Sequence, residues 1–183
     1  MRRVALTFGL LFSCAPDLRD DYPFDGVVAG DFLENKPDGE LTLSVVDATN
    51  KEASIYIDLG TASVVGVGEG WDIAFQRFNV ATNGGSSGVG PVRVAVIKDG
   101  DFIGLKQAPA EGYQQDGTGT VINTAEGGWY TYDLGVHKLV TREDLFYVID
   151  TGEGFFKLKM KSYYDDAGTS ARLQFWWGPV QSP

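Results

Sequence analysis

Residues 155–177, FFKLKMKSYYDDAGTSARLQFWW, decide the fold class of this chain. Apolar side chains occupy every second position in both arms of the stretch: Phe156, Leu158 and Met160, then Ala171, Leu173, Phe175 and Trp177. A period of two is typical of β-strands with one buried face, and the intervening DDAGT is typical of a turn. The stretch therefore predicts an antiparallel hairpin with Met160 in the core. The lysines of the first arm would form its solvated face: Lys157, Lys159 and Lys161.

The same period of two recurs along the rest of the chain, in the short segments 53–59, 71–76 and 92–96, and residues 145–150 form another short apolar run. The third of these segments precedes Asp99-Gly100, a dipeptide that favours a type I′ turn and so predicts another hairpin. No stretch shows the longer apolar period of an amphipathic helix. The sequence predicts an all-β, antiparallel two-sheet fold.

The composition excludes several classes of function. The 183 residues contain 15 Lys+Arg and 25 Asp+Glu, a formal net charge of −10. Binding of nucleic acid needs a basic surface, so we expect no nucleic-acid partner. One Cys and one His are too few for Cys/His zinc sites, disulfide frameworks or Cys–His catalytic pairs. The glycine-rich stretch 83–90 lacks the Gly-Lys-Ser/Thr ending of a phosphate-binding loop, and no Gly-x-Ser-x-Gly motif of a serine hydrolase is present. We therefore expect a protein that is not an enzyme.

The N-terminus has the pattern of an export signal. Two arginines precede the nine apolar-rich residues 4–12, too few to span a bilayer but typical of a signal peptide. Residues 11–14, Leu-Phe-Ser-Cys, resemble a bacterial lipobox, in which the cysteine carries the lipid. The alternatives are an ordinary signal peptide with an incidental cysteine, or a buried N-terminal helix. We expect a lipoprotein signal peptide over 1–13 and lipidation of Cys14.

Two further parts follow the expected signal peptide. Residues 14–35 include an acidic, proline-flanked and aperiodic stretch, which is typical of a tether. Residues 36–178 carry the period-two segments and form the expected β domain. The predicted protein is thus an exported bacterial lipoprotein whose domain lies close to a membrane surface.

His137 is the single histidine and has two interpretations. A lone histidine is most often an ordinary surface or hydrogen-bonded residue. Its neutral imidazole is also a favoured iron donor, which makes His137 a candidate metal or haem ligand. Met160 is a second possible haem ligand by residue type, but its place in the apolar period favours the core.

Several segments together resemble the HmuY family of haem-binding bacterial lipoproteins. They occur in the family's order, over about residues 40–177: VDAT (46–49), WDIAFQRF (71–78), ATNGG (81–85), GWYTY (128–132), FFKLKM (155–160), SYY (162–164) and AGT (167–169). The combination of the WDIAF and TNGG block with KLKMKSYY is the specific part of the resemblance.

The resemblance implies an all-β HmuY-like fold on a protein anchored at the cell surface or outer membrane. It implies haem as the cofactor, captured for delivery to an outer-membrane transporter, with two His or Met side chains clamping the iron. His137 stands about where the family can place one ligand. Residues 101–115, where the second would be sought, contain neither His nor Met. Two functions stay open: a haem-binding lipoprotein using His137, or a surface module that keeps the fold but binds a non-haem ligand or is structural.

Overall fold

The computed structural model of the chain describes residues 32–183. The expected signal peptide, Cys14 and most of the expected tether lie outside the described residues. Within the described range the chain forms thirteen strands and one short 3-10 helix: β1 (Leu33–Asp38), β2 (Leu41–Asp47), β3 (Ile55–Asp58), β4 (Ser63–Val65), β5 (Ile73–Gln76), β6 (Asn79–Thr82), β7 (Arg93–Lys98), β8 (Tyr113–Gln114), η2 (Val121–Asn123), β9 (Tyr130–Asp133), β10 (Lys138–Thr141), β11 (Leu145–Asp150), β12 (Phe155–Tyr164) and β13 (Ser170–Val180). No helix in 32–183 is long and apolar enough to cross a membrane.

The largest sheet has seven strands in the order β1-β2-β13-β12-β11-β7-β8, and every pairing in it is antiparallel. Its centre is the hairpin β12–β13, in which Leu158 pairs with Trp177 and Met160 pairs with Phe175. Met160 is 3% exposed and belongs to the main core. The hairpin predicted from residues 155–177, with Met160 in the core, is confirmed.

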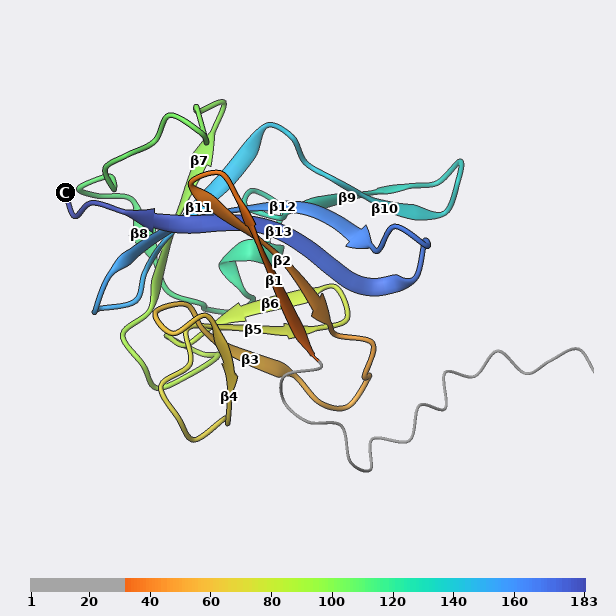
Figure 1. The fold of residues 1–183 in the computed structure, drawn as a ribbon, viewed down its shortest axis with the longest axis horizontal. Helices are drawn as coiled ribbons and strands as arrows, with labels where there is room; N and C mark the ends of the chain where they lie inside the picture. The colour runs from red at the N-terminus through yellow and green to blue at the C-terminus, as the bar shows by residue number, and fades with distance from the viewer. Residues whose placement is uncertain (1–31) are drawn as a thin grey trace, which may run out of the picture.

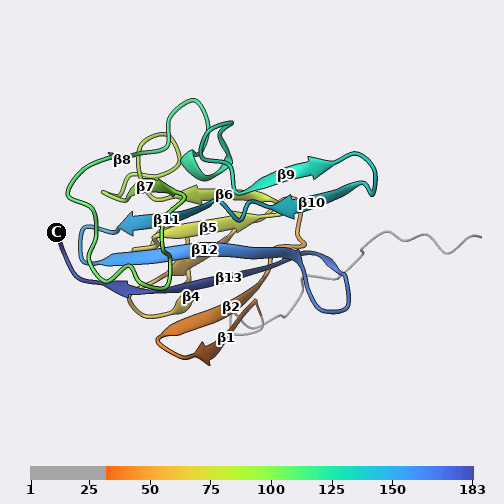
Figure 2. The ribbon, with the colours of Figure 1, turned by 90° about the horizontal axis from the view of Figure 1, so that it is seen from above.

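A four-stranded sheet, β4-β3-β5-β6, packs against one face of the seven-stranded sheet (Figures 1 and 2). Its strand β3 alternates buried and less buried residues, as the period of two predicts: Ile55 and Ile57 are buried, whereas Tyr56 and Asp58 are half-buried. The main core lies between the sheets and includes Phe75 from the small sheet and Phe175 from the large one. The all-β, antiparallel two-sheet fold is therefore confirmed.

A loop over residues 99–112 covers part of the opposite face of the large sheet. Phe102 and Ala108 of this loop form a second apolar cluster with Phe146 and Val148 of β11. Beneath the loop lies Lys157, which is only 4% exposed. The prediction that Lys157 lies on a solvated face is wrong, because a segment distant in sequence folds back over that face.

The predicted hairpin at Asp99-Gly100 is also wrong. Asp99 has a positive φ of 53°, but Gly100 does not, whereas a type I′ turn needs positive φ at both central residues. Strand β7 pairs with β11 along its whole length, and the Asp99 amide donates to the Asp144 carbonyl at the end of that ladder. Sheet pairing therefore determines the path of the chain here, and the chain reaches β8 only through the long loop.

The glycine-rich stretch 83–90 is held closely to the body of the protein. The Asn83 side chain donates to the Trp71 carbonyl and accepts from the Gly90 amide, at 2.8 and 2.9 Å. Gly85 has a φ of 63°, and a Cβ there would lie 1.9 Å from the Asp116 carbonyl oxygen. Only glycine fits this close approach of two backbone segments.

Candidate functional site

Strands β9 and β10 form a separate two-stranded hairpin that projects from the body of the molecule (Figure 1). Tyr132 pairs with Leu139 and Asp133 pairs with Lys138, so residues 134–137 make the turn. The Asp133 carboxylate accepts the amides of Gly135 and Val136, at 2.7 and 3.3 Å. This local cap determines the shape of the turn without help from the core.

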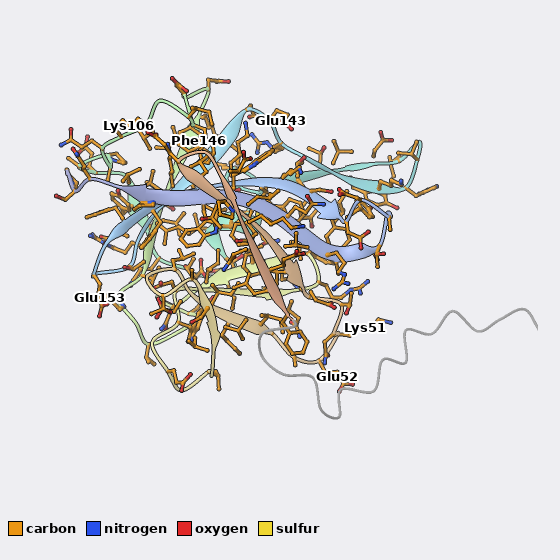
Figure 3. The ribbon with its side chains drawn as sticks, viewed as in Figure 1. Lys51, Glu52, Lys106, Glu143, Phe146 and Glu153 are labelled. Atoms are coloured by element: carbon orange, nitrogen blue, oxygen red, sulfur yellow. The ribbon has the colours of Figure 1, made fainter. Side chains whose placement is uncertain are left out.

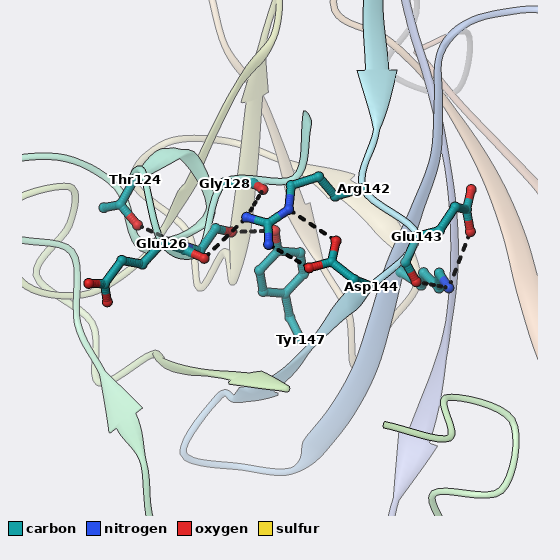
Figure 4. A network of polar contacts seen from close by, with 9 residues as sticks. Thr124, Glu126, Gly128, Arg142, Glu143, Asp144 and Tyr147 are labelled. Carbon is teal, nitrogen blue, oxygen red and sulfur yellow. Dashed lines mark hydrogen bonds and ion pairs between the residues drawn. The ribbon is translucent and has the colours of Figure 1, made fainter. Parts of the chain in front are cut away.

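The base of the hairpin is anchored by buried and charged groups. Trp129, just before β9, is 1% exposed, and its indole nitrogen donates to the Phe78 carbonyl at 3.1 Å. Arg142, just after β10, donates to the carbonyls of Glu126 and Gly128 and to both carboxylate oxygens of Asp144 (Figure 4). The base is therefore fixed on both strands, while the turn points into solvent.

His137 lies in the turn of this hairpin and is exposed. Its backbone adopts a φ of 53°, a left-handed conformation that is uncommon for a residue other than glycine. Its Nδ1 lies 3.1 Å from the hydroxyl oxygen of Tyr132, within hydrogen-bond distance. The structure thus pairs the one imidazole of the chain with a phenol five residues earlier.

The same hairpin carries three exposed apolar side chains. Leu134 is 77% exposed, Val136 is 61% exposed and Val140 is 45% exposed. We call residues 132–140 the hairpin surface.

A cleft of about 450 Å³ lies on the outer face of the large sheet, beside the loop 99–112. Its walls combine apolar and charged side chains: Asp38, Leu41, Asp101, Phe102, Ile103, Glu143, Lys159 and Trp176. Glu143, at the mouth of this cleft, is labelled in Figure 3. The Lys159 ammonium donates to the Glu143 carbonyl at 3.0 Å, and the indole nitrogen of Trp176 donates to Asp38 at 3.0 Å.

Lys157 lies under the loop that forms one wall of this cleft. Its ammonium donates to the carbonyls of Phe102, Ile103 and Leu105, at 2.9 to 3.0 Å. Burial lowers the pKa of Lys157 below its usual value. His137 is not among the residues that line the cleft, so the structure does not bring the lysines of β12 and the histidine into one site.

A second cleft, of about 560 Å³, lies where the two sheets meet and is lined by Asp58, Trp71, Asp72, Glu153 and Phe156 among others. Burial, with repulsion from Asp58 and Glu153, raises the pKa of Asp72 to about 6, although the Leu59 amide donates to its carboxylate. This buried carboxylate was missed from the sequence, where it occupies one position of an alternating strand pattern. The cleft is acidic and contains no imidazole.

The donors available for iron are few. Within residues 32–183 no group of three or more His, Cys, Asp or Glu side chains could hold a metal ion. Met160 is enclosed in the core and cannot reach a ligand at the surface. Among the described residues, Tyr132 and His137 bring the one imidazole of the chain within hydrogen-bond distance of a phenol.

Comparison with known proteins identifies the fold just described. Residues 50–177 match the family described as HmuY protein. The chain belongs to the HmuY family. The match includes the hairpin surface, the β12 lysines and the buried Asp72, and the resemblance inferred from the sequence segments is confirmed.

Solved structures with this HmuY-like fold come from several bacteria. A Bacteroides vulgatus protein assigned as HmuY-like and haem-binding aligns with a TM-score of 0.54 at 17% identity, over 80% of this chain and 95% of its own. A Bacteroides fragilis protein assigned as a lipoprotein aligns with a TM-score of 0.58 at 17% identity, over 86% of this chain and 100% of its own. The apo form of a Tannerella forsythia HmuY analogue aligns with a TM-score of 0.56 at 15% identity, over 79% of this chain and 95% of its own. None of the curated proteins matches the chain.

Proposed function

We propose that this HmuY-family protein is a haem-binding lipoprotein of the bacterial cell surface, and that haem binds at the hairpin surface with His137 in its iron site. The observation that carries the proposal is the placement of the one histidine. It lies within the family match, on an exposed turn, beside a phenol and among uncovered apolar side chains.

The donor set of the hairpin surface fits the chemistry of haem. The porphyrin is a flat apolar ring, and Leu134 and Val136 in the turn offer exposed apolar contacts for it. Imidazole and phenol are both ligands of haem iron in proteins. The family membership and the haem-binding assignment of the B. vulgatus relative support the same ligand.

Titration of the purified full chain with hemin tests the proposal. We expect a saturable shift of the Soret band in the unchanged protein and a clear loss of affinity in His137→Ala. Thr131→Ala is the matched control, because Thr131 is exposed on the same hairpin but, one position before Tyr132 in the strand, lies on the opposite face from it. An unchanged Soret band in the native protein would reject haem binding.

We further propose that Cys14 carries a lipid that anchors the protein at the outer membrane, where an outer-membrane transporter receives the haem. The lipobox-like residues 11–14 and the lipoprotein assignment of the B. fragilis relative support the anchor. Cells expressing the full chain should incorporate labelled palmitate into it, and Cys14→Ala should abolish the label. Equal labelling of both proteins would contradict the anchor.

A second candidate function rests on the cleft beside the loop 99–112. Its aromatic and aliphatic walls contain no His or Met, so it suits an apolar ligand without iron. This is the function of a non-haem binding module that keeps the family fold. It predicts that the protein does not bind hemin, that an aromatic anionic probe such as anilinonaphthalene sulfonate binds, and that Trp176→Ala weakens the binding of that probe.

A further inference from the structure

We propose that the cleft where the two sheets meet binds a small organic cation, an amine or guanidinium group carried on an apolar or aromatic body. This is the cleft of about 560 Å³ described above, and its volume suits a small molecule or a single side chain. None of residues 132–140 lines it, so the inference is independent of the proposed haem site.

The charged side chains in the walls of this cleft are all acidic. Asp58, Asp72 and Glu153 line it, and no lysine, arginine or histidine is among its described lining residues. No ion pair within residues 32–183 involves any of these three carboxylates. In the part of the chain that the structure describes, a cationic ligand would therefore displace no lysine or arginine from them.

Asp72 is the carboxylate that gains most from a cation. The residue is 8% exposed, and within residues 32–183 only its Oδ2 accepts a hydrogen bond, from the Leu59 amide at 2.8 Å. Burial disfavours the charged form, and the charges of Asp58 and Glu153 add repulsion, which raises the pKa of Asp72 to about 6. A cation in the cleft would offset both effects.

The backbone holds Asp72 in this position. Its amide donates to the Ile57 carbonyl at 2.9 Å, and its carbonyl accepts the Asn83 amide at 3.0 Å. The Asn83 side chain also donates to the Trp71 carbonyl at 2.8 Å. The carboxylate is thus fixed in the cleft wall before a ligand arrives, which reduces the entropy cost of binding.

The aromatic side chains of the cleft indicate the class of cation. Trp71 and Phe156 line it together with the carboxylates. Aromatic rings attract organic cations and also bury apolar carbon. The carboxylates do not converge on one point, since no group of three or more His, Cys, Asp or Glu side chains within residues 32–183 could hold a metal ion. The walls therefore fit a cation with an apolar body rather than a bare metal ion.

NMR titration of the isotope-labelled full chain with benzamidine tests the inference, and benzamide is the neutral ligand of similar shape. At about pH 8, where Asp72 is charged, we expect benzamidine to cause saturable shifts at the amides of residues 70–72 and 152–154, and benzamide to cause none. Asp72→Asn should weaken benzamidine binding by about tenfold or more, because it removes the charge from a hydrogen-bonded ion pair. Asparagine keeps the size of the side chain and an acceptor for the Leu59 amide.

A second variant and a matched control complete the titration. Glu153 is exposed, and its side chain forms no hydrogen bond within the described residues, so Glu153→Gln should fold normally, which circular dichroism checks. It should weaken benzamidine binding by a smaller factor than Asp72→Asn, because water screens its charge. Glu52→Gln is the control, since Glu52 is also exposed but lies well apart from Glu153 (Figure 3). This control should bind benzamidine as the native protein does.

A capped peptide, acetyl-Gly-Arg-Gly-amide, separates two sources of such a cation. Shifts at the same amides with this peptide would assign the cleft to an arginine side chain of a partner protein, whereas shifts with benzamidine alone would assign it to a free small cation. Equal binding of benzamidine and benzamide would overturn the inference. So would a native protein that responds to neither cation, or unchanged benzamidine affinity in both Asp72→Asn and Glu153→Gln.

Discussion

Phe75 of β5 and Phe175 of β13 stack on each other across the interface of the two sheets, with 5.2 Å between ring centroids and 18° between ring planes. Both side chains are at most 1% exposed. The pair joins the small sheet to the centre of the large one, so the layered fold depends on this contact.

Replacing Phe175 with alanine should lower the free energy of unfolding by about 3–5 kcal/mol, because it removes a buried ring and leaves a cavity between the sheets. Urea denaturation followed by tryptophan fluorescence measures the change. Phe175→Leu refills part of the space and should cost clearly less. Equal stability of the alanine variant and the native protein would show that the two sheets do not depend on this pair.

Lys157→Met should loosen the loop 99–112. The substitution leaves three carbonyl oxygens without their ammonium donor, at a cost of about 1–3 kcal/mol. Limited proteolysis should cut the variant faster within the loop. Lys161→Met is the control, because the Lys161 ammonium lies over the Trp176 ring, and it should leave the loop protected. Unchanged cleavage in Lys157→Met would refute the role of the buried ammonium.

Asp72 should make the protein less stable as the pH rises from about 4 to 6. Its pKa is raised from 3.8 to about 6 in the folded chain, so between these values the folded state holds more protons than the unfolded state. The expected loss is about 2 kcal/mol, less than the full shift implies because solvent reaches the cleft. Asp72→Asn should flatten this part of the melting-temperature profile. A profile that the substitution leaves unchanged would contradict the raised pKa.

Arg142→Lys should free the base of the β9–β10 hairpin. Lysine cannot contact both oxygens of Asp144 and also reach the carbonyls of Glu126 and Gly128, as the planar guanidinium does. Hydrogen exchange should quicken at the backbone amides of β9 and β10, while those of β12 and β13 keep their protection. Hemin affinity should fall as well if the hairpin surface is the haem site.

The sequence predicted the elements whose partners lie close along the chain. Residues 155–177 fold as expected because both strands and their turn are contiguous, and each alternates apolar and polar residues over enough positions to define a face. The burial of Lys157 was not predictable in this way. Its cover comes from residues 102–105, and nothing local to β12 signals that a distant loop returns there.

In the candidate site too, the sequence indicates single residues but not the contacts that depend on how the chain folds. His137 stood out from the sequence because it is the single histidine. Its partnership with Tyr132 depends on the register of a hairpin turn that Asp133 caps, and the four intervening positions do not by themselves set that register. The dipeptide Asp99-Gly100 carries a genuine turn signal, but the ladder between β7 and β11 overrides it.

The pairing of β2 with β13 joins segments from near the two ends of the described chain. The guanidinium of Arg172 meets the carboxylate of Asp47 at 2.7 Å across 125 positions of sequence. A chain synthesised from its N-terminus delivers β2 well before its partner strand, so the large sheet cannot close until residues 170–180 have been made. The protein should therefore fold slowly and only once its synthesis is nearly complete, with the edge of β2 that later pairs with β13 exposed in the meantime.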